Sequence, residues 1–262
     1  MIHYLTFDCT CWLAPWEAKG QLFAGNCDDE AQRSTLLISN DRSKSRRARL
    51  RRVFDDFLPA ALLREPAQVP RSVWLGDASS AMMPVRAVAV TGVDAALWGR
   101  TNFAGGFDRI LVDAPCSSER HFFLDKAAGQ VWTRARLKRD AELQSSILRN
   151  AVRLLAEGGR LVYATCSLAQ EENDGVISKL LKHRRHGAGL VLGDALGVEL
   201  QDASIARLLT GVERTSMGAR MLPDRSRFGP LYWSVLERLS PRSGESARDE
   251  PSVDPNSNPD PP

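Results

Sequence analysis

The stretch Phe107-Asp108-Arg109-Ile110-Leu111-Val112-Asp113-Ala114-Pro115-Cys116-Ser117 joins a short apolar run to a carboxylate, a proline and a thiol. The run from Ile110 to Val112 is typical of a buried parallel strand. Pro115 has no backbone N–H and a fixed φ, so the strand cannot simply continue past it. Asp113 and Cys116 are therefore expected at the carboxyl edge of a sheet, where open α/β folds bind their ligands.

A second stretch, Arg160-Leu161-Val162-Tyr163-Ala164-Thr165-Cys166-Ser167, has the same design. It too is an apolar run that ends on a thiol, and it predicts another buried strand. If the two strands are neighbours in one parallel sheet, their carboxyl ends meet at one edge. Cys116 and Cys166 would then reach the same crevice, although they lie far apart in the sequence.

Two further strands are predicted upstream, and an acidic residue follows each of them. Thr35 to Ser39 is typical of a short buried strand, and Asp41 follows it. Arg86 to Val90 predicts another strand, followed by a loop that carries Asp94. Acids are common in turns, so either acid alone is a weak signal. Three strands that run out into Asp41, Asp94 and Asp113 form the informative pattern.

A basic amphipathic helix is predicted from Lys44 to Phe57, with Ser43 as its cap. Apolar residues recur along one face at spacings of three and four, and arginines lie opposite them. The basic face is either only solvated or in contact with the phosphates of a nucleic acid. The apolar face consists of Leu50, Val53, Phe54 and Phe57, and the basic face of Arg46, Arg47, Arg49, Arg51 and Arg52.

Two more helices are predicted in the second half of the chain. A long one runs from about Arg134 to Ala156, and Gly158-Gly159 is expected to stop it. A shorter one runs from Asn173 to His183. The expected buried stripes are Leu143, Ile147, Ala151, Leu154 and Leu155 in the first helix, and Val176, Ile177, Leu180 and Leu181 in the second.

The alternation of strands and helices predicts an α/β fold with a mostly parallel sheet and helices on both faces. Residues 231–236 are apolar and follow Phe228-Gly229-Pro230, which predicts a late antiparallel hairpin. From Ser240 onward the chain is rich in Pro, Ser, Asp, Glu and Asn. Residues 239–262 are therefore predicted to be a disordered tail.

Composition restricts the possible partners only weakly. The 262 residues carry a formal net charge of +3, which permits a nucleic-acid partner without arguing for one. The five cysteines are scattered, so they indicate a reducing compartment rather than a disulfide framework, and their spacing predicts no metal site. No apolar run is long enough to cross a membrane, and neither a secretory signal nor a mitochondrial transit peptide is evident.

The thiols and acids suit one kind of chemistry. A pyrimidine ring is inert at the carbon that must be methylated, and addition of a thiolate to the adjacent carbon makes that carbon carbanion-like. A nearby acid that hydrogen-bonds the ring nitrogen stabilises the developing charge, and a second thiol assists breakdown of the adduct. A carboxylate at the end of an early strand, such as Asp41, typically binds ribose hydroxyls, and Asp94 suits the amine of an adenine.

At these residues the chain resembles the Sun/Fmu-type RNA (cytosine-5) methyltransferases. Residues 107–117 are similar to the signature of that family, and Thr165-Cys166-Ser167 with Glu171-Glu172-Asn173 to its second cysteine motif. The resemblance spans roughly residues 36 to 177 and also includes Gln144. The closing residues 220–224 and 228–232 are similar to the mitochondrial rRNA-modifying branch of the family.

The resemblance implies a Rossmann-like methyltransferase fold, S-adenosylmethionine as cofactor and no metal. It also implies an RNA substrate, and rRNA is the expected class of RNA. It implies that Cys166 attacks the cytosine, that Cys116 helps to release the enzyme, and that Asp113 contacts the ring nitrogen. The opposite cysteine assignment, as in DNA cytosine methyltransferases, stays open. The branch resemblance suggests mitochondria, with cytoplasm or nucleolus as alternatives. The implied cofactor-binding residues are Asp41, Asp94, Asp113 and Lys19.

One motif departs from the family pattern. The family binds its cofactor on a turn with the sequence Ala-Pro-Gly-Gly-Lys, and the nearest match is Ala14-Pro15-Trp16-Glu17-Ala18-Lys19, which lacks both glycines. Residues 1–34 are accordingly predicted to be a degenerate or incomplete start of the cofactor-binding half, and residues 35–238 the catalytic domain. A second hypothesis is therefore a non-catalytic relative that binds rRNA or a ribosome-assembly protein. A third, a small-molecule methyltransferase, is disfavoured by the two thiols.

Overall fold

The computed structural model of the protein describes residues 4–5, 35–58, 60, 63–64, 86–97, 107–117, 133–196, 210–226 and 228–240. Over these residues no helix combines the length and the apolar character needed to cross a membrane. The strands are β1 (Tyr4–Leu5), β2 (Thr35–Asn40), β3 (Leu63–Arg64), β4 (Arg86–Thr91), β5 (Phe107–Asp113), β6 (Leu155–Thr165), β7 (Leu190–Leu192), β8 (Val212–Arg214), β9 (Ala219–Met221) and β10 (Leu231–Arg238). The helices are α2 (Lys44–Phe57), α5 (Arg134–Arg153), the short 3-10 helix η6 (Gln170–Glu172) and α6 (Asp174–Leu181).

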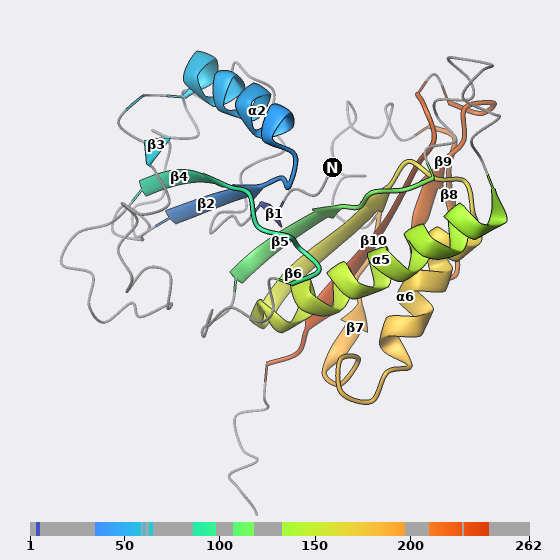
Figure 1. The fold of residues 1–262 in the computed structure, drawn as a ribbon. Coiled ribbons are helices and arrows are strands. Elements are labelled where there is room, and N and C mark those ends of the chain that lie inside the picture. Colours follow the sequence, from blue (N-terminus) through green and yellow to red (C-terminus); the bar gives the residue numbers. More distant parts are fainter. Residues whose placement is uncertain are drawn as a thin grey trace, which may run out of the picture.

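The strands form two hydrogen-bonded groups (Figure 1). In the first group, β2 and β3 both pair with β4 in parallel. In the second, β5 and β6 pair in parallel, and β10 lies antiparallel between β6 and β9. The short β1 pairs with β5 and also contacts β2, so it lies between the two groups. The parallel strands predicted from their apolar runs and the late antiparallel hairpin are confirmed.

Helix α2 has the bounds and the cap that its sequence predicts. The Ser43 hydroxyl accepts a hydrogen bond from the Arg46 N–H at 3.4 Å. Its expected apolar face, however, is not buried: none of its side chains is, and Val53 and Phe57 are 45% and 56% exposed. The spacing thus predicts an apolar face on this helix but not whether that face is buried, and α2 packs on β4 without burying it.

Helix α5 is shorter than predicted, and its buried stripe differs from the predicted one at a single position. It ends at Arg153, and Leu155 already belongs to β6, so Gly158 lies inside that strand with φ of 72° rather than at the helix end. Leu143, expected in the buried stripe, is 38% exposed. The other predicted positions, Ile147, Ala151, Leu154 and Leu155, are buried as expected, although Leu154 and Leu155 lie beyond the end of the helix. The buried residues of α5 itself are Leu137, Asp140, Gln144, Ser145, Ile147, Leu148, Ala151 and Val152.

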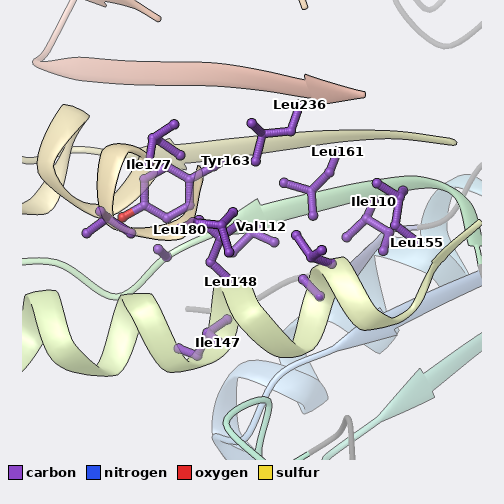
Figure 2. Packing of buried hydrophobic residues seen from close by; sticks show 14 of the residues in the cluster. Ile110, Val112, Ile147, Leu148, Leu155, Leu161, Tyr163, Ile177, Leu180 and Leu236 are labelled. Atoms are coloured by element: carbon purple, nitrogen blue, oxygen red, sulfur yellow. The ribbon is translucent and has the colours of Figure 1, made fainter. Parts of the chain in front are cut away.

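The core lies between α5, α6 and the strands β5, β6 and β10 (Figure 2). Tyr163 from β6 packs edge-on against Tyr232 from β10, with ring centroids 6.4 Å apart. Helix α6 begins one residue later and ends two residues earlier than predicted, and Leu181 is only partly buried. The labelled core side chains are Ile110, Val112, Ile147, Leu148, Leu155, Leu161, Tyr163, Ile177, Leu180 and Leu236.

Two predicted segments fall largely outside the described residues. Of the predicted degenerate start, residues 1–34, only the two residues of β1 are described. The predicted tail is described only as far as Ser240. The predicted domain boundaries therefore stay predictions.

Candidate active site

The two thiols lie side by side where β5 and β6 end. Asp113 on β5 pairs in register with Ala164 on β6, and the Ala114 N–H donates to the Ala164 carbonyl at 2.9 Å. Because the two strands end level with each other, the loops that follow them begin side by side. The sulfurs of Cys116 and Cys166 are 2.9 Å apart, and both residues are half-buried. The pair therefore occupies one place at the sheet edge and keeps access to solvent.

The loop that carries Cys116 is held by a buried carboxylate. Glu172 is fully buried and accepts hydrogen bonds from the Ser117 N–H at 2.9 Å and the Ser117 hydroxyl at 2.5 Å. The Gln144 amide donates to the Glu172 carboxylate at 3.1 Å and to the Pro115 carbonyl at 2.7 Å. Both neighbours of Cys116 are thereby fixed to the same network, which sets the position of the thiol between them.

The loop that carries Cys166 is held by a buried amide. The Thr165 hydroxyl donates to Asn173 Oδ1 at 2.6 Å, and Asn173 Nδ2 donates to the Ser167 carbonyl at 2.9 Å. The hydroxyls of Ser117 and Ser167 are 3.3 Å apart, so the two loops also contact each other. Asn173 follows Glu172 directly, and one short segment thus fixes both thiol loops.

Tyr163 holds the backbone of the segment that contains Glu172 and Asn173. Its hydroxyl donates to the Glu172 carbonyl at 2.7 Å. Burial first, and then the nearby Glu172, Tyr232 and Cys116, raise the pKa of Tyr163 well above its ordinary value. The phenol is therefore a neutral hydrogen-bond donor at physiological pH, and its role is to hold the backbone.

Asp41 has an unused acceptor. The residue is 2% exposed, and its Oδ1 accepts from the Ser43 N–H at 2.8 Å. Its Oδ2 is buried and has no hydrogen-bond partner among the described residues. A buried carboxylate oxygen without a donor is costly, so such an oxygen points to a ligand hydroxyl. This observation fits the ribose of a nucleoside cofactor.

The neighbouring Asn40 and Asp94 bind the protein itself. Asn40 crosses from β2 to β4, where its Oδ1 accepts from the Thr91 hydroxyl at 2.8 Å and its Nδ2 donates to the Val93 carbonyl at 3.0 Å. Asp94 accepts from the Ala96 N–H at 3.0 Å and forms an ion pair with the exposed Arg42 at 3.3 Å. Asp94 therefore lies at the end of β4, as expected, and half-exposed.

Of the predicted site residues, the structure brings Asp113, Cys116 and Cys166 to the end of β5 and β6, and Asp41 and Asp94 to the ends of β2 and β4. Lys19 lies outside the described residues. Glu172 is the residue whose role sequence reasoning missed. The only signal was its place in a motif, because nothing in the local pattern shows that this glutamate is buried.

No group of His, Cys, Asp and Glu residues that could hold a metal ion occurs within the part of the chain that the structure describes. The family model described as 16S rRNA methyltransferase RsmB/F matches residues 77–237, which include both thiol loops, Asp94 and Glu172. The chain belongs to this family.

Two curated relatives of this RsmB/F-family chain extend the match. The 5-cytosine rRNA methyltransferase NSUN4 of Xenopus tropicalis is 28% identical over 219 residues, 80% of this chain and 47% of the relative. The mitochondrial tRNA (cytosine(34)-C(5))-methyltransferase of Mus musculus is 29% identical over 188 residues, 69% of this chain and 51% of the relative. The chain thus spans about half the length of the curated relatives it matches.

The fold is shared with a solved structure. NSun6 from Pyrococcus horikoshii, solved with SFG, matches with a TM-score of 0.51 at 19% sequence identity, over 78% of this chain and 41% of that one. The expected Rossmann-like methyltransferase fold, with parallel strands, helices and C-terminal antiparallel strands, is confirmed.

Proposed function

We propose that the protein is an S-adenosylmethionine-dependent methyltransferase that forms 5-methylcytosine in RNA through a covalent cysteine–cytosine adduct. The observation that carries the proposal is the pair of half-buried sulfurs 2.9 Å apart at the end of β5 and β6. A nucleophile and a second acid–base group must both reach one pyrimidine ring, and this pair satisfies that requirement. The names of the rRNA and tRNA cytosine-5 relatives support the same reaction.

The first step uses Cys166. Its thiolate adds to C6 of a cytosine, which breaks the aromaticity of the ring and leaves C5 carbanion-like. Asp113, on the strand that leads to Cys116, hydrogen-bonds the ring nitrogen and stabilises the charge that develops there. S-adenosylmethionine, when bound, supplies the methyl group that C5 takes up.

The second step uses Cys116. After methylation, C5 carries both a methyl group and its original proton, and the Cys166–C6 bond is still intact. Cys116 assists removal of the C5 proton, and the electrons of the C5–H bond restore the ring as Cys166 leaves as thiolate. The network of Glu172, Ser117 and Gln144 keeps Cys116 beside Cys166 through both steps.

The cofactor would be held at the ends of β2 and β4. The buried Oδ2 of Asp41 can accept from a ribose hydroxyl, and Asp94 can accept from the adenine amine in exchange for its exposed partner Arg42. Lys19 would complete this site, because it matches the lysine of the family's cofactor-binding turn. rRNA is the proposed substrate, because a relative named as an rRNA methyltransferase matches the chain. The mitochondrion is the proposed compartment, because a relative named as mitochondrial also matches.

The trapped adduct tests the proposal. Cys116→Ala should accumulate a covalent RNA–protein complex, because the adduct forms but its breakdown is impaired. Cys166→Ala should form none. The measurement is a denaturing gel of each variant after incubation with rRNA and S-adenosylmethionine. The reverse pattern would make Cys116 the nucleophile. If neither the wild type nor either variant forms an adduct or 5-methylcytosine, the proposal is overturned.

A second candidate function rests on the altered turn at residues 14–19, where Trp16 and Glu17 replace the family glycines. This candidate is a non-catalytic protein that binds rRNA or a ribosome-assembly partner. Calorimetry with S-adenosylmethionine separates the two functions, because only the methyltransferase requires the cofactor. An absence of binding at millimolar cofactor would leave the second candidate alone.

A further inference from the structure

We propose that the basic face of α2 is an RNA-binding surface that contacts the phosphates of a single strand. The inference rests on the proposed RNA substrate and adds the surface that holds the RNA outside the target base. The surface consists of a row of arginines along the helix, at positions 46, 49 and 52, and the exposed aromatic Phe57 lies beyond this row at the C-terminal end of the same helix. Helix α2 begins three residues after Asp41, so its start lies beside the candidate cofactor site.

The first observation is the concentration of charge. Residues 42–52 contain seven Lys and Arg residues and no acid, although the net charge of the whole chain is only +3. Arg46, Arg49 and Arg52 are all exposed, and none has an ion-pair partner in the described ranges. Residues three apart are neighbours on a helix, with Cβ atoms about 5–6 Å apart, so these guanidinium groups form one continuous row.

The second observation is that this charge opposes helix stability. Like charges three and four residues apart destabilise a helix. The first turn of α2 has no acid, its last turn has no base, and Asp55 and Asp56 lie near its C-terminus. Both ends are therefore charged against the helix dipole, which favours acids at the start and bases at the end. A bound polyanion along the arginine row relieves the repulsion, which gives this arrangement a physical reason.

The third observation separates the arginine row from arginines that serve the fold. The Arg47 guanidinium donates to the carbonyls of Asp41 and Arg42, both at 2.8 Å, and Arg42 pairs with Asp94. These two residues are used locally, at the loop before the helix. Among the described residues, Arg46, Arg49 and Arg52 make no such side-chain contact, and all three are exposed to solvent.

The exposed aromatic indicates a single strand rather than a duplex. Phe57 is 56% exposed at the end of the helix. Proteins that bind single-stranded nucleic acid combine a positive track for the backbone with aromatic side chains on which bases stack. Val53, 45% exposed, lies one turn before Phe57 and extends the same apolar margin.

The salt dependence of RNA binding tests the surface. The full-length protein and the triple variant Arg46→Ala, Arg49→Ala, Arg52→Ala are titrated with a labelled, unstructured, cytosine-containing RNA of about 16 nucleotides, the upper end of single-strand site sizes. Each lost phosphate contact lowers the slope of log K against log salt by about 0.7, so the triple variant should lose about 2 units of slope. Its affinity at low salt should fall by tenfold or more, to a similar degree for different RNA sequences.

Two further variants act as controls. Arg46→Lys, Arg49→Lys, Arg52→Lys keeps the charges and should keep most of the slope. Lys179→Ala, Lys182→Ala, Arg184→Ala removes an equal charge from exposed positions at the end of α6, which packs on α5 instead of β4, and it should keep the slope of the wild type. Because alanine favours helix and removes repulsion, the first triple variant should unfold no earlier than the wild type.

The outcomes distinguish this surface from the proposed function. If the wild type forms the Cys166 adduct but the α2 variant binds RNA with an unchanged slope, the surface is wrong and the methyltransferase stands. An equal loss of slope in the α6 control would mean general charge attraction, and would also overturn the surface. A wild type that neither binds RNA nor forms an adduct would contradict both proposals.

Discussion

Glu172 is the single side chain on which the geometry of the candidate site depends most. It is fully buried, and its carboxylate accepts from the backbone and hydroxyl of Ser117 and from the amide of Gln144. A buried carboxylate is tolerated only where donors surround it. The donors come from the loop after β5 and from α5, so this one residue connects the Cys116 loop to the helix behind it.

Glu172→Gln is therefore expected to destabilise the protein. The amide has one acceptor oxygen in place of two and adds two donors where donors already converge. Leaving buried donors unsatisfied costs roughly 1–3 kcal/mol. Urea unfolding measures the difference, and Glu171→Gln is the matched control, because Glu171 is the exposed neighbour in the same short helix. Equal effects of the two substitutions would contradict the role assigned to Glu172.

At the residue scale, the sequence predicts the places of the thiols and acids but not of their supports. Cys116 and Cys166 could be placed together because each follows an apolar run, and parallel strands end at a common edge. Glu172 could not be assigned in this way. Its burial results from the meeting of η6, α5 and the Cys116 loop, and no local pattern in a run of Gln and Glu encodes that meeting.

At the scale of elements, α5 shows how a polar residue decides which face of a helix is buried. Gln144 is fully buried, donates to the Pro115 carbonyl and the Glu172 carboxylate, and shares the inward face with Ile147, Leu148 and Ala151. A count of apolar residues alone selects Leu143 in its place. The hydrogen bonds to Pro115 and Glu172, which the apolar spacing does not reveal, thus explain why Gln144 and not Leu143 is buried at this turn of the helix.

Leu148 and Leu143 make a matched pair on this helix. Leu148→Ala should lower the free energy of unfolding by about 2–5 kcal/mol, because it leaves a cavity among fully buried side chains. Leu143→Ala should change it by no more than about 0.5 kcal/mol, because that side chain is 38% exposed. Denaturant unfolding of both variants measures the difference. A large loss from Leu143→Ala would restore the stripe expected from the sequence.

The predicted end of α5 is wrong because its two glycines lie inside the following strand. Gly158-Gly159 has the appearance of a helix stop, yet β6 begins at Leu155 and Gly158 adopts φ of 72° within it. A left-handed glycine suits both a helix end and a bend in a strand, so the dipeptide alone does not distinguish them. On the apolar face of α2, Val53 and Phe57 are exposed, since amphipathic spacing predicts a face but not the surface that covers it.

At the scale of the whole molecule, the order of elements was predictable because alternating strands and helices fold in few ways. What the sequence leaves open is how the C-terminal strands join the parallel core. β10 inserts beside β6 in antiparallel register, from Tyr232 opposite Thr165 to Glu237 opposite Arg160. This pairing places β10 next to β6, the strand that leads to Cys166, so the late strands form part of the support of the site.

Asp174 fastens this junction. It is 8% exposed, lies at the start of α6, and accepts from the hydroxyls of Thr215 at 2.7 Å, Ser216 at 2.8 Å and Tyr232 at 2.8 Å. Burial is the largest single effect and by itself would raise the pKa of Asp174, but the hydrogen bonds from Thr215, Ser216 and Tyr232 together hold that pKa below its ordinary value. One carboxylate thereby ties α6 to the loop between β8 and β9 and to β10.

This arrangement predicts how the stability of the molecule depends on acid. Because the pKa of Asp174 is lower in the folded state than in the unfolded chain, its contribution is complete above the unfolded value of about 3.9 and is lost as the pH falls through the lower folded value. Asp174→Asn should therefore unfold more easily than the wild type at pH 6, and the gap between the two should narrow toward pH 3. Thermal or urea unfolding at a series of pH values measures the gap, with Asp224→Asn, an exposed acid, as the control that should follow the wild type. A gap that stays constant down to pH 3 would show that the charge of Asp174 does not fasten the C-terminal strands to the core.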